Sequence, residues 1–273
     1  MKTLLPGRPR LLADETLTSF LVRTMAANRE PLGRIPRLLG LPERTSSERL
    51  DFAPPDRWLA ALAGHTGRPL PLLREATLGT ASPLERRPAA FWRDAVAPGD
   101  WFLRDRAYRG KAHPRTIQFC PDCMNGGQPY LRRRWRLALY SACLRHRRIL
   151  LNRCEKCGAA VKPLRLRGRR PDLRTCWSCG ESLTSTRGPP ASPFVIRLER
   201  ALEGASENKI ILDQWRSALG RSLARLITFR ELEMGADMQV SVPPQYYGPK
   251  DRHDAVARDK PALERFCAFL EEL

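Results

Sequence analysis

The sequence predicts a mainly α-helical protein that also carries small β modules built around metal ions. Apolar residues recur at helical spacing before residue 80 and again after residue 184, and seven of the eight cysteines fall between these regions. Four parts follow from this pattern: a helical, helix-turn-helix-like N-terminal domain at 1–80, a proline- and arginine-rich linker at 81–118, a tandem metal-binding domain at 119–183, and a helical C-terminal domain at 184–273.

The N-terminal domain begins with two short predicted helices. Asp14 is the expected N-cap of the first, and Asn28 ends it. Its apolar positions have helical spacing: Leu17, Phe20, Leu21 and Met25. A second short helix is expected at Ile35–Leu39 after a turn at Pro31. Two short helices joined by a tight turn at 14–40 resemble a helix-turn-helix, although an ordinary helical corner has the same periodicity.

A third helix is marked at both ends. Pro54-Pro55-Asp56 starts it and Gly64 is expected to close it, which places His65 in a structural position at the helix end. Trp58, Leu59 and Leu62 form its apolar face. A further short helical piece is expected at 69–76.

The linker and the C-terminal domain carry weaker signals. The linker has four aromatic residues that can serve as packing anchors or stack on bases: Phe91, Trp92, Trp101 and Phe102. C-terminal helices are expected near Leu198 and Leu202, over 209–233, and from Pro261 onward. Cys267 lies on the apolar face of the last helix and is interpreted as a buried core thiol.

The metal-binding domain contains two quartets of soft ligands in tight pairs. The first quartet is Cys120, Cys123, Cys143 and His146, and the second is Cys154, Cys157, Cys176 and Cys179. Four thiolate or imidazole donors are what a tetrahedral Zn²⁺ ion requires. Between the halves of the first quartet, Trp135 to Tyr140 resembles a short strand or strand pair.

The spacing favours structural zinc over disulfides, a redox pair or an iron–sulfur cluster. None of those alternatives explains why a histidine completes the first quartet and a fourth cysteine the second. Gly158 and Gly180 directly follow the second cysteine of a pair, where a left-handed backbone is needed. A catalytic zinc keeps one position open for water, whereas both quartets are filled by the protein. Two structural Zn²⁺ ions are therefore expected.

The net charge of +19 is concentrated in the metal-binding region. Residues 1–100 carry 15 Lys+Arg and 11 Asp+Glu, residues 101–190 carry 21 and 5, and residues 191–273 carry 12 and 13, giving +4, +16 and −1. Such a field favours a polyanion such as nucleic acid. A solvated basic face that only maintains solubility is the alternative. The candidate contacts to a nucleic-acid backbone or a partner are Arg132, Arg133, Arg134, Arg136, Arg145, Arg147, Arg148, Arg165, Arg167, Arg169 and Arg170.

Enzymatic motifs are missing from the sequence. It has no glycine-rich phosphate loop, no His-Glu-x-x-His and no nucleophile elbow, so a non-enzymatic protein is expected. Asp94, Asp100 and Asp105 offer carboxylates for Mg²⁺ but are better explained as solvated groups. Neither a signal peptide nor a membrane span is recognisable, and a cytoplasmic, nucleoid-associated protein is expected.

The order of these features resembles the TniQ/TnsD proteins of cut-and-paste transposons over about residues 11–180. The residues that carry the resemblance are Glu15-Thr16-Leu17-Thr18-Ser19-Phe20-Leu21-x-Arg23, Leu59-x-x-Leu62-x-x-x-Thr66-Gly67, Phe119-Cys120-Pro121-x-Cys123, Trp135-Arg136, Cys143-x-x-His146 and Leu151-x-x-Cys154-x-x-Cys157-Gly158. Leu144 stands where the family commonly has proline. The C-terminal part is shorter than in members that read an attachment site by themselves.

The resemblance implies a target-selection adaptor. Such a protein links a target-DNA recogniser, in some members a CRISPR RNA-guided effector complex, to the AAA+ ATPase regulator of the transposase. Members of this kind often dock as homodimers. The alternative is a sequence-specific DNA-binding protein that reads an attachment site or operator directly through residues 14–40 or 209–233. An adaptor binds DNA weakly and without sequence preference, whereas a reader prefers its site by ~10³-fold or more.

Overall fold

A computed structural model gives the architecture of the chain. It describes residues 4–41, 46–52, 54–78, 107–108, 111–112, 117–136, 140–193, 195–197, 199–200 and 203. Helix predominates in this part of the chain, and the strands there are two residues long. The chain divides into two compact units, the first made of Met1–Arg86, Phe102–Tyr140 and Leu150–Gly188, and the second of Arg87–Trp101, Ser141–Ile149 and Pro189–Leu273.

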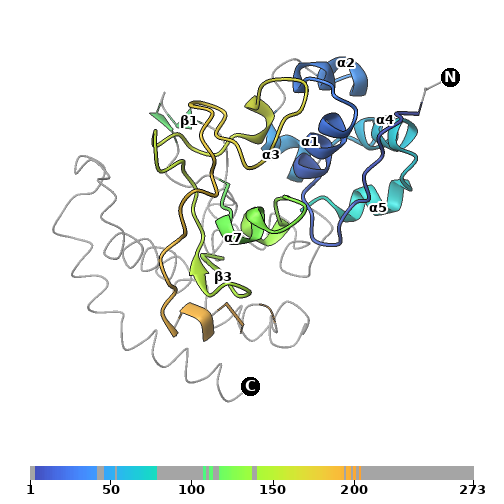
Figure 1. Cartoon of the computed structure of the whole chain (residues 1–273). Coiled ribbons are helices and arrows are strands. Elements are labelled where there is room, and N and C mark those ends of the chain that lie inside the picture. Colours follow the sequence, from blue (N-terminus) through green and yellow to red (C-terminus); the bar gives the residue numbers. More distant parts are fainter. Residues whose placement is uncertain are drawn as a thin grey trace. The chain divides into compact units, whose positions relative to one another are not determined.

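The helices of the first unit begin with α1 (Leu17–Ala27), which is a core element (Figure 1). Every residue from Leu17 to Met25 is buried. The N-cap is Thr16, whose Oγ1 accepts a hydrogen bond from Ser19 N at 3.1 Å. The prediction of Asp14 as N-cap is therefore wrong, because its carboxylate pairs with Arg132 instead. Asn28 ends the helix as predicted.

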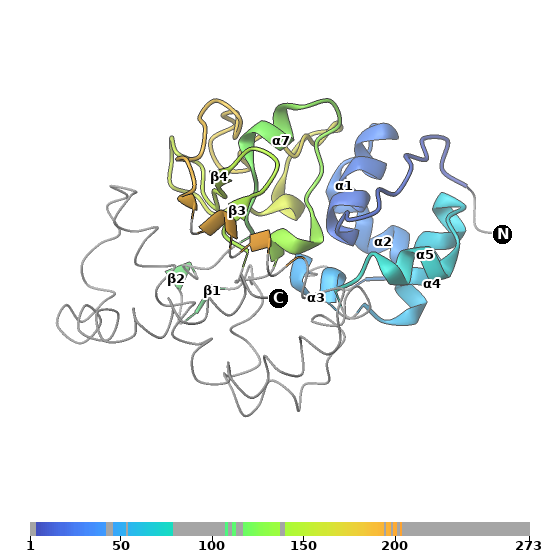
Figure 2. The same ribbon diagram turned by 90° about the horizontal axis from the view of Figure 1, so that it is seen from below.

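Four further helices lie in the same helical cluster as α1 (Figures 1 and 2). A 3₁₀ turn (Leu32–Arg34) leads into α2 (Ile35–Leu39), which has the predicted bounds. Helix α3 (Ser47–Phe52) is missing from the sequence prediction. Helix α4 (Asp56–Thr66) begins as predicted but ends at Gly67 (φ 66°) rather than at Gly64. Helix α5 (Leu70–Glu75) fulfils the prediction for 69–76.

A buried polar network fixes α1 to the segment around Leu131. Glu15 is fully buried and pairs with Arg23, while Ser19 Oγ donates to Glu15 Oε1 at 2.7 Å. Ser19 Oγ also accepts from Leu131 N at 3.0 Å, and Thr16 N donates to Leu131 O at 2.9 Å. These bonds attach the start of the helical region directly to the segment that precedes the 3₁₀ turn Arg133–Arg136.

The remaining elements are short. In the linker region, β1 (Ala107–Tyr108) pairs antiparallel with β2 (Lys111–Ala112). Helix α7 (Pro121–Asn125) starts inside the first ligand pair, and a 3₁₀ turn (Pro163–Arg165) lies inside the second quartet. Trp135 lies in the 3₁₀ turn Arg133–Arg136, so the predicted strand is wrong there, and residues 137–139 lie outside the described residues.

The described part of the second unit is a hairpin packed on a helical segment. Strand β3 (Ala142–Cys143) pairs antiparallel with β4 (Arg148–Ile149). Ala142, Ile149, Val195 and Ile196 form its small apolar core. The buried carboxylate of Glu199 accepts from Ser141 N at 2.7 Å and from Ala142 N at 3.0 Å. The helices predicted over 209–233 and from Pro261 onward, with Cys267, lie outside the described residues.

Candidate metal centres

The four cysteines of the second quartet form a compact set. All four Sγ atoms lie within 4.8 Å of one another. The Sγ atoms of Cys154 and Cys179 are 3.7 Å apart, and so are those of Cys157 and Cys176. A disulfide needs about 2.05 Å, whereas four sulfurs around Zn²⁺ at about 2.3 Å lie about 3.8 Å apart. The side chains therefore have the spacing of a metal site and not of disulfides.

The two cysteine pairs of this quartet lie on two separate backbone turns of the same type. In the first turn, Gly158 N donates to Cys154 O at 2.8 Å, and Cys154 N donates to Ala159 O at 2.9 Å. The equivalent bonds of the second turn are Gly180 N to Cys176 O at 3.0 Å and Cys176 N to Glu181 O at 2.8 Å. Gly158 and Gly180 have φ values of 68° and 78°, which confirms the left-handed positions that the sequence predicts.

Backbone amides of these turns point at the sulfur atoms. Amides of Lys156 and Cys157 bond to the Cys154 sulfur, but burial outweighs them and raises the pKa of the Cys154 thiol to about 12. At Cys157 the amide of Ala159 lowers the thiol pKa to about 7. Amide donors stabilise a thiolate, so the turns are prepared for metal-bound sulfur.

The first quartet also brings its four ligand atoms together. Those of Cys120, Cys123, Cys143 and His146 all lie within 4.8 Å of one another. Cys143 Sγ lies 3.6 Å from His146 Nδ1, close to the separation of about 3.6 Å that a tetrahedral zinc with one sulfur and one nitrogen ligand imposes. Both quartets can therefore hold a metal ion, and their donor chemistry and spacing fit zinc.

The Cys143–His146 turn departs from the other hairpin turns at one residue. Arg147 N donates to Cys143 O at 2.7 Å, so Arg147 has the place that Gly158 and Gly180 have in the second quartet. Its φ of 52° is left-handed although the residue is not glycine. The Cys120–Cys123 pair lies instead at the start of α7, where Met124 N donates to Cys120 O at 3.0 Å. This role of Arg147 was not predicted, although Arg147 follows His146 in the sequence just as Gly158 follows Cys157 and Gly180 follows Cys179.

Five of the predicted arginine contacts are engaged within the protein. Arg132 pairs with Asp14 at 2.5 Å, and Arg133 donates to the carbonyls of Glu75 and Ala13. Arg136 is only 1% exposed, and its Nε lies 3.6 Å from the buried Asp51. Arg134 and Arg148 are half-buried and also interact with the protein. We call these five residues the engaged arginines.

The other six are exposed: Arg145, Arg147, Arg165, Arg167, Arg169 and Arg170. None of their side chains forms an ion pair or hydrogen bond with another residue in the part of the chain that the structure describes. The guanidinium of Arg165 lies over the Trp177 ring, 5.1 Å from its centroid. We call these six residues the free arginines.

Comparison with known families decides the membership of the chain. The TniQ family matches residues 6–150, which contain the buried α1 network and the whole first quartet. The chain belongs to the TniQ family. This TniQ chain accordingly has a role related to transposition. No curated protein matches it.

The family match covers the first quartet but not the second. It ends at residue 150, four residues before Cys154, so the Cys154–Cys179 quartet lies outside the matched region. The Glu15–Ser19–Arg23 part of the motif is buried, and its role in this chain is to hold α1 against Leu131. Within the described residues, no helix has the length and apolar character needed to cross a membrane.

Proposed function

We propose that this TniQ-family chain is a target-selection adaptor for transposition. It links a target-DNA recognition complex, an RNA-guided effector, to the AAA+ ATPase regulator that recruits the transposase. The observation that carries this proposal is the family match across residues 6–150. As in other adaptors of this kind, two copies of the chain dock together, and contacts to protein surfaces dominate over contacts to DNA bases.

The chain itself carries no catalytic centre in this proposal. Each quartet supplies four protein donors to its metal, so both zinc sites have every coordination position filled and are structural. A catalytic zinc would need a position for water or substrate. The metal ions therefore hold the basic region in shape, and the chemistry of DNA cleavage and joining belongs to the transposase.

Direct sequence reading is the weaker candidate. In the helix-turn-helix-like segment, α2 has only five residues, and its Ile35 and Leu39 are buried in the protein. A recognition helix places several side chains on base edges in the major groove. Helix α2 offers few side chains for this purpose, which supports an adaptor over a reader.

A cellular insertion assay tests the adaptor proposal. The transposon is mobilised with its native genes, and insertion sites are mapped by sequencing with and without the gene for this chain. The proposal expects insertions at the preferred target to be lost without the chain, while the transposase retains activity in vitro. An unchanged distribution of insertion sites, or strand cleavage by the purified chain alone, would contradict it.

A further inference from the structure

The free arginines of the second metal centre are gathered in one loop. Residues 162–170 contain five Lys+Arg and no Asp or Glu. Arg165, Arg167, Arg169 and Arg170 are all exposed, and we call residues 165–170 the arginine loop. The nearest carboxylate in sequence, Asp172, is already bonded to Arg174, whose guanidinium donates to it at 2.8 to 3.1 Å. The positive charge of the loop is therefore not neutralised by a described neighbour.

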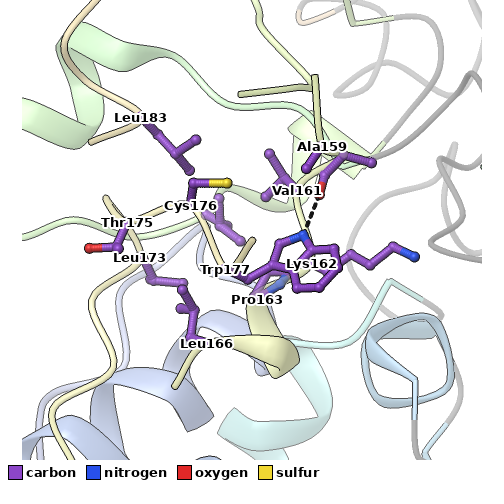
Figure 3. Close-up of a pocket in the computed structure, with 12 residues that line it drawn as sticks. Ala159, Val161, Lys162, Pro163, Leu166, Leu173, Thr175, Cys176, Trp177 and Leu183 are labelled. Atoms are coloured by element: carbon purple, nitrogen blue, oxygen red, sulfur yellow. Dashed lines mark hydrogen bonds between the residues drawn. The ribbon is translucent and has the colours of Figure 1, made fainter. Parts of the chain in front are cut away.

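The arginine loop is held on a folded base. Leu166 is buried at 8% exposure and lies with Leu173, Trp177 and Val161 around a small apolar pocket (Figure 3). Trp177 Nε1 donates to Ala160 O at 2.8 Å, which fixes the indole ring. Pro171 is also buried, and Gly168 turns the chain with a φ of 87°. Leu166 and Pro171 thus anchor a short segment whose arginines point away from the core.

Trp177 lies next to metal ligands in the sequence and also contacts basic side chains. It lies between two ligands of the second quartet, Cys176 and Cys179. Arg165 lies 5.1 Å and Lys162 Nζ 5.9 Å from the centroid of its ring. Cation–π contacts restrict both side chains and reduce the entropy that they would lose on binding a ligand. A metal-stabilised fold therefore presents preorganised cations.

The composition of the loop decides what class of partner it fits. Protein interfaces have an apolar core, but the exposed side chains of residues 165–170 are arginines. The large exposed apolar side chains in the described chain are Leu4 and Leu72, neither of which belongs to this loop. Arginine forks suit phosphate groups, and a surface that offers only cations reads charge and not sequence.

We propose that the arginine loop of the second metal centre binds the phosphate backbone of nucleic acid without sequence preference. This inference rests on the proposed function, since an adaptor at a target site lies next to the DNA and to any guide RNA. The loop would hold the complex on the backbone while the partner supplies specificity. The engaged arginines contribute less, because Arg132, Arg133 and Arg136 already pair with or donate to other groups of the protein. Arg134 and Arg148 are half-buried.

A charge-matched pair of variants tests the arginine loop. The loop variant is R167Q/R169Q/R170Q, and the control is R8Q/R10Q/R57Q, three exposed arginines of the helical region outside residues 14–40. Both variants lower the net charge from +19 to 19 − 3 = +16. Binding of the full chain to a fluorescent duplex DNA of random sequence is measured by anisotropy between about 50 and 200 mM KCl. Zinc content and thermal unfolding verify that both variants fold.

The loop variant should bind the duplex at least about tenfold more weakly than the wild type. Its plot of log K against log [salt] should become less steep by about 2.7, because three phosphate contacts are lost. The control should keep a slope close to that of the wild type. An RNA duplex arm establishes whether the loop also accepts a guide. Equal losses in the two variants, or equally tight binding of polyglutamate, would overturn the proposal.

The outcome for the loop is separable from that for the adaptor. If the loop variant binds DNA normally and the insertion assay still requires the chain, the nucleic-acid surface lies elsewhere and the adaptor role stands. If the loop variant loses DNA binding but deletion of the gene leaves insertion sites unchanged, the surface exists and the adaptor role fails.

Discussion

The two candidate metal centres bring four ligand side chains together on different backbone structures. The second quartet pairs two equivalent hairpin turns, each with a glycine in the left-handed position. The first combines a helical turn at α7 with a hairpin turn that has Arg147 in that position. Cys157 and Cys179 of the second quartet are exposed, whereas none of the cysteines in the first is.

The difference indicates a division of roles. The first quartet falls within the family-matched residues and uses ligands on short elements bounded by buried residues such as Phe119 and Leu150. The second quartet lies beyond the match, is built from one continuous segment, and carries the arginine loop. We infer that the first centre supports the fold and the second presents a surface.

The largest effect is expected from breaking the second centre. Cys176→Ser removes one of its ligands and should reduce the zinc content from two equivalents to one. Structural zinc contributes an apparent ~10–16 kcal/mol in small zinc-finger peptides, so this module should lose its fold. Hydrogen exchange should speed up across residues 154–183 while α1 and α4 remain protected.

The matched control for this experiment is Ser178→Ala, which changes an exposed residue of the same turn that is not a ligand. Full protection of residues 154–183 in the Cys176→Ser protein would mean that the metal does not hold this module. Loss of protection in α1 as well would mean that the two regions unfold as one, and the division of roles would be wrong.

A smaller but still severe effect is expected in the α1 network. Arg23→Met leaves Glu15 buried without its cation, which should cost about 3–5 kcal/mol of unfolding free energy, measured by urea titration. Burial already raises the pKa of Glu15, against the opposing effect of Arg23. Because a raised folded-state pKa favours the protonated form, the stability of this variant should fall as pH rises above the ordinary range of glutamate.

The double variant Glu15→Gln/Arg23→Met is the control. It removes both charges while retaining a side-chain oxygen for Ser19, so it should recover most of the stability and lose the pH dependence. If the double variant did not regain stability, the hydrogen-bond geometry of these side chains, and not the balance of their charges, would hold α1 in place.

Local rules predict the features of this fold that depend on neighbouring residues. Ligand spacing identified both quartets, and Asp56 after two prolines identified the start of α4. The N-cap of α1 was missed because Asp14 bonds to Arg132, a partner far away in sequence. Helix α3 has six residues, too few for a clear helical period.

The separation of the arginines could not be predicted from sequence either. Arg132, Arg133 and Arg136 look equivalent to Arg167 and Arg169 in a charge count. Their partners belong to residues 13–14, 51 and 75, so only the tertiary structure separates engaged from free side chains. Charge density locates a basic region but does not say which of its cations are available.

Backbone strain gives a third test of the comparison. Gly158 has a φ of 68° and open space where a Cβ would be placed. Gly158→Ala should therefore cost only about 1–2 kcal/mol, which is the energy that alanine needs to adopt a left-handed backbone. The measurement is the zinc concentration that half-saturates the second quartet, which should rise. Gly40→Ala, at another left-handed glycine that lies outside both quartets, should leave zinc affinity unchanged.

The smallest effect is expected at the equivalent residue of the first centre. Arg147 has a left-handed φ of 52°, and Arg147→Gly removes the strain that this conformation causes in a non-glycine residue. Glycine also increases the conformational entropy of the unfolded chain, so the free energy of unfolding should rise by only about 0.5–1 kcal/mol. Thermal unfolding measures it against Arg145→Gly, an exposed arginine of the same turn with no positive φ, which should destabilise slightly. Both variants remove one positive charge, so a gain confined to position 147 isolates the backbone contribution. Equal changes in the two proteins would show that the turn tolerates Arg147 without strain, and that the two centres differ in surface and not in backbone energetics.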